Sequence, residues 1–443
     1  MWQRIKKLIQ SNAFASLAGN GAGALLGIST IAIQARTLSK EDFGSWIVFA
    51  TTFGLFDVIR SGFILNPVIR NMAAAQTADE KSRVAGAAWQ LCSLFTVITV
   101  AIFTLPGIVF YSWFQSFDLG FFVQWFWLLA FITMPHNLAT WFLNASANFK
   151  KVQWVRISNQ ALFLLLNVAN IKWGYGISFI FWSFVISQLA TTLLTLVLGW
   201  SRLGDFSRGE KTERGNLYSF GKYSMFTLLF SNLLRSSDTY ILGIFLGPVA
   251  VGIYNIPQRL LQVFEMPISA ISITRLPTLA GLHTKGNHDE LTKEFHRSTG
   301  TLWLAILPVA ALCFVFAEPL VVLLGGEGFR ESAAVLRFFA IYASFLPLER
   351  YSGIGLDVVN KPRLNLIKVI LMFAVNVLGD IAVIKWFPNS PVAAVAAVSV
   401  LTFGSGVFVG YWFLSKHIKF TFTGIISSGW QSLAAMAGIG KQK

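Results

Sequence analysis

Charged side chains lie inside several long apolar segments of this 443-residue sequence, where such groups are costly and usually functional. Asp57 and Arg60 are three residues apart, and Arg235 and Asp238 repeat that spacing later in the chain. Residues three or four apart share one side of a helix, so each acid can pair with its base. Arg259 has no acid at either spacing, which predicts a functional role for its charge.

Further candidate residues have amide or acidic side chains. Gln258 and Gln262 lie close to Arg259 in an expected helix, and Glu265 continues their line. Asn20 is a further polar candidate, in the first expected helix. The main candidates for carrying a coupling ion are the acids Asp57, Asp238 and Glu265, and Asp380 is a further one.

The pattern of histidines and cysteines predicts neither a metal centre nor a disulfide. His136 has no second His or Cys at the spacing of metal ligands. Cys92 and Cys313 both fall within apolar stretches, where a cysteine is typically a small core residue. The sequence also has no Gly-rich phosphate loop, HExxH motif or nucleophile elbow. We therefore expect a protein that is not an enzyme and needs no cofactor.

The elements that must hold these side chains are membrane-spanning helices. Hydrophobic residues make up 55% of the chain and charged residues 12%, against roughly 25% charged residues in a soluble domain. Apolar runs of about 20 residues, enough to cross a bilayer, recur throughout. We expect an all-α protein with spans near residues 12–35, 43–64, 83–104, 122–144, 155–173, 177–200, 221–245, 250–272, 300–324, 332–355, 364–386 and 391–415.

The distribution of basic residues predicts the orientation in the membrane. Most of the 35 Lys and Arg residues fall on one side of the expected spans, and that side is typically cytoplasmic. Both termini are then cytoplasmic, and the net charge of +15 needs no nucleic acid as a partner. The loops are too short to hold a soluble domain, which disfavours a membrane glycosyltransferase or polymerase.

The spans divide into two similar halves. A shift of 208 residues aligns Phe56-Asp57 with Phe264-Glu265, which indicates a parallel repeat of the kind found in transporters. We expect an N-terminal six-helix bundle over residues 1–200 and a cytoplasmic linker over 201–220. A C-terminal six-helix bundle over 221–415 and a cytoplasmic or interfacial tail over 416–443 would follow.

Three stretches carry a resemblance to a known family. They are GNGAGALLGISTIAIQARTLSKEDFGSW at 19–46, the segment from DTYILG to PTLAGL at 238–282, and LLGGEGFRESAAVLR at 323–337. The sequence resembles the Wzx-type polysaccharide flippases of the multidrug/oligosaccharidyl-lipid/polysaccharide exporter superfamily, and is similar to the related lipid II flippases. Lipid II flippases usually carry arginines early in the first helix, where this chain has Asn20. That departure favours a different glycan.

The resemblance implies a V-shaped pair of bundles around a cationic cavity in the bacterial inner membrane. The substrate would be an undecaprenyl-pyrophosphate-linked oligosaccharide for O-antigen (lipopolysaccharide), capsule or exopolysaccharide assembly. Arg259 would meet the pyrophosphate, with Arg60 sharing that role and Arg235, Gln258, Gln262 and Asn20 lining the cavity. Membrane lipid, H+ or Na+ for coupling and the glycan polymerase machinery would be the other partners. The alternatives are a lipid II flippase and a cation-coupled exporter of small molecules from the same superfamily.

Overall fold

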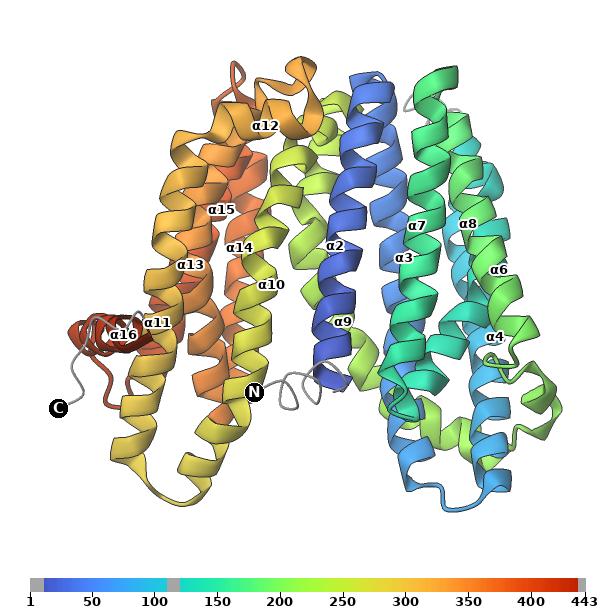
Figure 1. Cartoon of the computed structure of the whole chain (residues 1–443), viewed down its shortest axis with the longest axis horizontal. Coiled ribbons are helices and arrows are strands. Elements are labelled where there is room, and N and C mark those ends of the chain that lie inside the picture. Colours follow the sequence, from blue (N-terminus) through green and yellow to red (C-terminus); the bar gives the residue numbers. More distant parts are fainter. Residues whose placement is uncertain (1–11, 110–119, 437–443) are drawn as a thin grey trace, which may run out of the picture. The chain divides into compact units, whose positions relative to one another are not determined.

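The computed structural model describes residues 12–109 and 120–436, and every regular element within these ranges is a helix (Figure 1). A helix satisfies its backbone hydrogen bonds internally, which is what an apolar environment requires of a spanning segment. The expected cytoplasmic N-terminal segment and the last residues of the tail lie outside the described residues. Of the described helices, eight are long and apolar enough to cross a membrane: α3, α4, α6, α8, α11, α13, α14 and α15.

The first half of the chain forms six long helices that match the first six expected spans. Their bounds are α2 (Asn12–Thr37), α3 (Lys40–Ala74), α4 (Ala78–Val109), α6 (Gly120–Ala145), α7 (Phe149–Trp173) and α8 (Ile177–Val197). Most of them extend a few residues beyond the expected spans, because charged first turns and caps continue the helices outside the apolar segments. Ser39, for example, caps α3 by accepting a hydrogen bond from the amide of Asp42 at 3.0 Å.

The second half repeats this order and adds a C-terminal helix. Its elements are the 3-10 helix η1 (Leu203–Arg208), α9 (Lys211–Leu246), α10 (Pro248–Thr284), α11 (His288–Val315), α12 (Ala317–Gly325), the 3-10 helix η2 (Glu327–Phe329), α13 (Ser332–Val358), α14 (Pro362–Trp386), α15 (Pro391–Leu414) and α16 (Phe422–Met436). The expected linker over 201–220 is therefore mostly helical. Leu217 explains why, because it is fully buried in an apolar core with Phe63 and Trp89 and so holds the start of α9 against the first unit.

The helix bounds support the expected duplication. Adding 208 to the bounds of α3 gives 248–282, and the observed α10 covers Pro248–Thr284. The same shift carries α4 to 286–317, where α11 covers His288–Val315. The pairs α6 with α13, α7 with α14 and α8 with α15 follow in the same order along the chain.

The chain divides into two compact units, and the division falls within α9 and α10. Unit 1 comprises residues 1–236 and 247–252, and unit 2 comprises residues 237–246 and 253–443. In unit 1 the start of α10 approaches α3 so closely that a Cβ on Gly44 would collide with the carbonyl oxygen of Pro248. A glycine is therefore required there for the backbones to meet.

Candidate functional site

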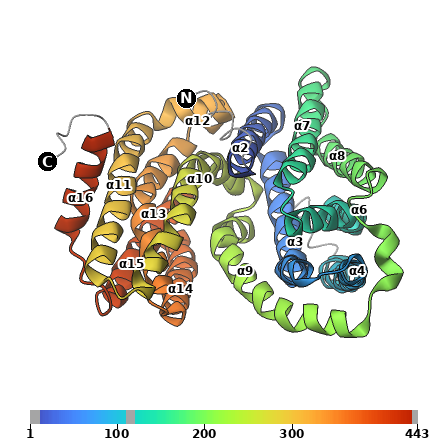
Figure 2. The same ribbon diagram turned by 60° about the horizontal axis from the view of Figure 1, so that its bottom comes forward.

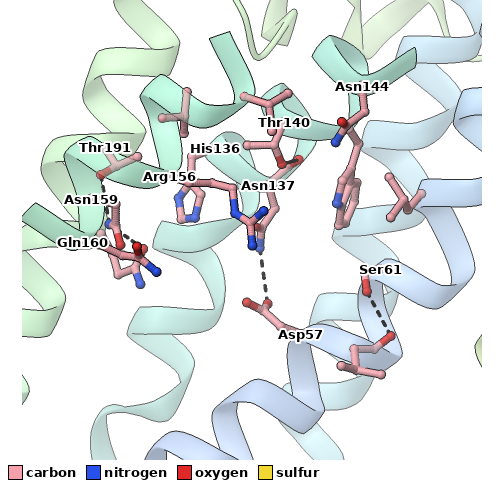
Figure 3. Close-up of a pocket in the computed structure, with 16 residues that line it drawn as sticks. Asp57, Ser61, His136, Asn137, Thr140, Asn144, Arg156, Asn159, Gln160 and Thr191 are labelled. Carbon is pink, nitrogen blue, oxygen red and sulfur yellow. Dashed lines mark hydrogen bonds between the residues drawn. The ribbon is translucent and has the colours of Figure 1, made fainter. Parts of the chain in front are cut away.

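A cavity of about 430 Å³ opens within unit 1 between α3, α6, α7 and α8 (Figure 3). This volume falls within the roughly 300–1,000 Å³ of small-molecule sites. Its polar lining is Asp57, Ser61, His136, Asn137, Thr140, Asn144, Arg156, Asn159, Gln160, Gln188 and Thr191. Val58, Leu65, Trp141, Val152 and Val155 complete the wall. Polar groups at this depth in spanning helices usually mark a functional site.

Asp57 is the acidic residue in the cavity wall, and its charge is balanced by Arg60, which does not line the cavity. The Arg60 side chain is fully buried and forms an ion pair with the Asp57 carboxylate. Its Nη1 donates to the carbonyl oxygen of Ala130 at 2.7 Å, and its Nη2 donates to Thr133 Oγ1 at 2.9 Å. The expected pairing of the two charges within α3 is confirmed. In this conformation Arg60 positions Asp57 and does not line the cavity, so its predicted contact with substrate stays a prediction.

The carboxylate of Asp57 itself reaches the cavity. The side chain is 34% exposed, and its Oδ1 also accepts a hydrogen bond from Asn137 Nδ2 at 3.3 Å. Figure 3 shows Asn137 and Asp57 pointing toward one another across the cavity. Asn137 follows Pro135, which removes one backbone donor from the middle of α6.

Amide side chains from α7 and α8 form the opposite wall. Asn159 Nδ2 donates to Gln188 Oε1 at 3.1 Å and to Thr191 Oγ1 at 2.9 Å. Gln160 Oε1 is buried and accepts no hydrogen bond from any described group. An amide oxygen left this way is ready to accept from a ligand hydroxyl or amide. His136, on α6, interacts through Nδ1 with Thr192 Oγ1 at 3.0 Å.

Arg156 brings a positive charge to the same cavity, and Asn20 supports it. The Arg156 side chain is exposed, and its Nη1 donates to Asn20 Oδ1 at 3.5 Å. Gln153 donates to the same oxygen at 3.4 Å. Asn20 therefore acts in this structure through Arg156 and does not itself line the cavity. The two residues join α2 to α7 within unit 1.

The sequence interpretation missed most of the polar cavity residues, among them Arg156, Asn159, Gln160 and Gln188. By sequence alone, Arg156 counts among the basic residues on the side expected to be cytoplasmic. The sequence does hold a signal for them, because Asn159 and Gln160 lie three and four residues after Arg156, on the same side of α7. The helix is the least apolar expected span of the first half, and its polar side is the one that faces the cavity.

Unit 2 holds a second, fully buried polar cluster around Asp238. Its carboxylate accepts hydrogen bonds from the Tyr254 hydroxyl and from Asn376 Nδ2. The same Asn376 nitrogen donates to Asp380 Oδ2 at 3.1 Å, so one amide joins the two carboxylates. Asp380 Oδ1 is buried and accepts no hydrogen bond from any described group. Asp238 was a predicted ion-coupling residue, and the fold supplies Asp380 and Asn376 beside it.

The remaining predicted residues lie on α9 and α10. Arg259 Nε donates to Asn255 Oδ1 at 3.4 Å, and Asn255 Nδ2 donates to Gln258 Oε1 at 3.3 Å, so Arg259 and Gln258 share one amide. In the described part of the chain no carboxylate forms an ion pair with Arg259. Of the other predicted residues, Arg235 is exposed on α9, and Gln262 and Glu265 are partly buried on α10.

Metal ligands are not gathered anywhere in the described chain. Across residues 12–109 and 120–436, no group of three or more His, Cys, Asp or Glu side chains could hold a metal ion. The chemistry of both clusters is hydrogen bonding and charge, from amides, hydroxyls and a few carboxylates and guanidinium groups. Such groups can bind and orient a polar ligand.

Long helices in two compact units, eight of them in the described chain long and apolar enough to cross a membrane, define a multi-pass membrane protein. The family model described as "Polysaccharide biosynthesis protein" matches residues 33–334, and the chain belongs to that family. A probable low-salt glycan biosynthesis flippase of Haloferax volcanii is 22% identical over 58% of this chain and 54% of its own length. The teichuronic acid biosynthesis protein TuaB of Bacillus subtilis is 22% identical over 51% of this chain and 46% of its own. The chain thus spans about half the length of these curated relatives.

Solved transporter structures share the fold. An inward-facing multidrug resistance MATE family transporter of the MOP superfamily superposes with a TM-score of 0.75 at 15% identity, over 92% of this chain and 99% of the other. The lipid II flippase MurJ in an inward closed conformation gives a TM-score of 0.71 at 12% identity, over 96% of this chain and 93% of the other. These similarities confirm the expected all-α fold of the exporter superfamily.

Proposed function

We propose that this protein is a flippase that moves a lipid-linked oligosaccharide across the bacterial cytoplasmic membrane for polysaccharide assembly. The observation that carries the proposal is the cavity of unit 1, with neutral amides and hydroxyls on most of its polar wall. These groups match sugar hydroxyls as donors and acceptors. Membership of the polysaccharide biosynthesis family supports the same reading. O-antigen, capsule and exopolysaccharide are the products to be tested.

The charge of the cavity favours a neutral or anionic ligand. Arg60 compensates the charge of Asp57, and Arg156 adds a positive charge. A cationic drug, the substrate of the alternative exporter, would therefore find no uncompensated carboxylate in this cavity. This charge balance is compatible with a lipid II flippase and with a flippase for another glycan. The short loops between the expected spans disfavour a membrane glycosyltransferase or polymerase.

The carrier in the proposal is undecaprenyl pyrophosphate, and Arg259 is the residue proposed to hold it. A guanidinium binds phosphate oxygens through paired hydrogen bonds, and no described carboxylate forms an ion pair with Arg259. The prenyl tail would stay in lipid while the polar head crosses by alternating access. Arg235, Gln258 and Gln262 are retained as further contacts of the head group.

The proposal includes coupling to H+ or Na+, with Asp238 as its first candidate. The carboxylates of Asp238 and Asp380 accept from one Asn376 nitrogen and would repel each other if both were charged. A proton or a bound cation would relieve that repulsion. Asp57 and Glu265 are the other candidates. Asp57 is less suited, because Arg60 already balances its charge.

Proteoliposomes containing the full chain provide the test. A fluorescent undecaprenyl-pyrophosphate oligosaccharide is placed in both leaflets, and a membrane-impermeant glycosidase reports the fraction that becomes accessible. Without protein, the glycosidase should reach only the lipid in the outer leaflet. With protein present, we expect the accessible fraction to exceed that value. A matched vesicle set receives an organic cation as the rival substrate. Movement of the cation with no movement of the lipid-linked sugar would overturn the proposal. Glycan polymerase partners are tested separately, by affinity purification from cells that make the polymer.

A further inference from the structure

The C-terminal helix α16 is fixed to α11 within unit 2. Gly300 of α11 and Gly429 of α16 meet so closely that a Cβ on either would collide with the backbone of the other helix. The amide of Thr421 donates to His296 Nε2 at 3.1 Å and ties the start of α16 to the same helix. In both Figure 1 and Figure 2, α16 lies against α11. Figure 1 shows that α16 runs across the direction of the long helices of the unit.

The crossing point sets the depth of α16. His296 and Gly300 lie between the charged first turns of α11, with Lys293 and Arg297, and its apolar stretch from Leu302 onward. This is where a spanning helix leaves the hydrocarbon core. The α16 helix therefore lies at the level of the lipid headgroups, on the side that carries most of the Lys and Arg residues.

One flank of α16 carries a partly exposed apolar stripe. Phe422, Ile426 and Trp430 follow one another at a spacing of four residues and are 48%, 45% and 68% exposed. Ile425 and Gly429, each one residue before a member of the stripe, are buried on the neighbouring side against α11. A short helix that carries an apolar stripe at headgroup level lies in the plane of the interface, with that stripe directed into the lipid.

Exposed basic side chains occur on the two segments next to α16. Lys416 and Lys419 are exposed in the segment that leads into α16, and Arg297 is exposed on α11. The Lys416 ammonium lies 4.3 Å from the ring of Trp412, an arrangement of a cation and an indole that suits the interface. Anionic phospholipids of the cytoplasmic leaflet attract such clusters.

We infer that α16 is a lipid-binding element that inserts Phe422, Ile426 and Trp430 beneath anionic headgroups held by Lys416, Lys419 and Arg297. Through Gly300 and Gly429, bound lipid would hold the cytoplasmic end of α11 at a fixed depth. The inference goes beyond the proposed flippase activity, because it requires only the position and chemistry of α16. Loss of transport and loss of lipid contact can therefore be told apart.

Depth-dependent fluorescence quenching tests this inference on the full chain. Cys92 and Cys313 are replaced by Ala, and a single cysteine is introduced by Ile426→Cys or, as the matched control on the next side of the helix, by Ser427→Cys. Each variant is labelled with an environment-sensitive dye and reconstituted in vesicles with anionic lipid and a doxyl quencher near the top of the acyl chain. We expect quenching at 426 to exceed that at 427 by about twofold or more.

Three results would overturn the inference. Equal quenching at the two positions, or none at 426, would show that the stripe does not enter the lipid. Energy transfer between dyes at 426 on separate molecules would show that a second copy covers the stripe. Unchanged quenching when phosphatidylcholine replaces the anionic lipid would remove the headgroup contact. The double variant Lys416→Gln/Lys419→Gln should reduce the dependence on anionic lipid at least about twofold, while Lys361→Gln on another loop should leave it unchanged.

Discussion

Arg60 and Asp57 form an ion pair in which the base is fully buried and the acid reaches a cavity. The Arg60 guanidinium also donates hydrogen bonds to two groups of α6, the carbonyl of Ala130 and the hydroxyl of Thr133. The pair therefore anchors α3 to α6 and presents a carboxylate of fixed position to the ligand. Removing the base leaves a partly exposed acid in the cavity without its partner, whereas removing the acid leaves a fully buried base.

Arg60→Met should destabilise the folded protein by about 1–3 kcal/mol, because it removes the buried donors to Ala130 and Thr133 while Asp57 stays partly exposed. A lower unfolding temperature in detergent and a lower amount of protein in the membrane would report this. The control is Arg363→Met, at the exposed start of α14. An Arg60→Met protein with unchanged stability and reduced transport would instead support the earlier prediction that this arginine contacts substrate.

Filling the cavity should stop transport without unfolding the protein. Ser61 lines the cavity, so Ser61→Phe should reduce flipping at least about tenfold by excluding a ligand from a cavity of about 430 Å³. The unfolding temperature should fall little, because the new ring enters empty space. Ser29→Phe, at an exposed position of α2, is the matched control. Full activity of the Ser61 variant would place the substrate elsewhere.

Arg259→Ala should reduce flipping more than any other single arginine substitution. The loss of charge-assisted contacts worth about 1.5–3 kcal/mol each predicts a decrease of roughly tenfold to a hundredfold. Arg259→Lys should restore only part of the activity, because an ammonium lacks the paired donors of a guanidinium. Polymer on the cell surface, corrected for the amount of protein, is the measurement. Normal polymer in the Ala variant would contradict the role in substrate binding.

Asp238→Asn and Asp380→Asn should remove the dependence of transport on a proton or sodium gradient. The amide keeps the side-chain volume and can still bond to Asn376, so both variants should fold. Transport in proteoliposomes with and without each gradient is the measurement, and Asp57→Asn and Glu265→Gln are tested beside them. Gradient dependence that survives in the Asp238 and Asp380 variants would exclude this cluster from coupling.

Cysteines at Ser39 and Lys285 should react with a membrane-impermeant reagent from opposite sides. Ser39 caps α3, and Lys285 follows α10, so the two positions lie at opposite ends of the repeated helices. With Cys92 and Cys313 replaced, external reagent should label Ser39→Cys in intact cells and leave Lys285→Cys unlabelled. The reverse pattern would invert the orientation inferred from Lys and Arg residues.

The sequence by itself determined the class of fold and the local pairs. Apolar runs of a fixed length give the helices, because the bilayer sets how long a spanning segment must be. The ion pair of Asp57 with Arg60 was also predictable, because a helix brings residues three apart onto one side. The repeat of 208 residues was visible in the spacing of similar segments, and the helix bounds follow it.

Only the tertiary structure decided which polar sides face one another. Asn137 reaches Asp57 across 80 positions of the chain, and Asn376 reaches Asp238 across 138. Helical periodicity tells which residues share a side of one helix, but it holds no information about which other helix covers that side. Arg156 illustrates the difference, because its place near a helix start reads as a cytoplasmic charge, whereas the packing of α7 against α2 and α8 turns it into the cavity.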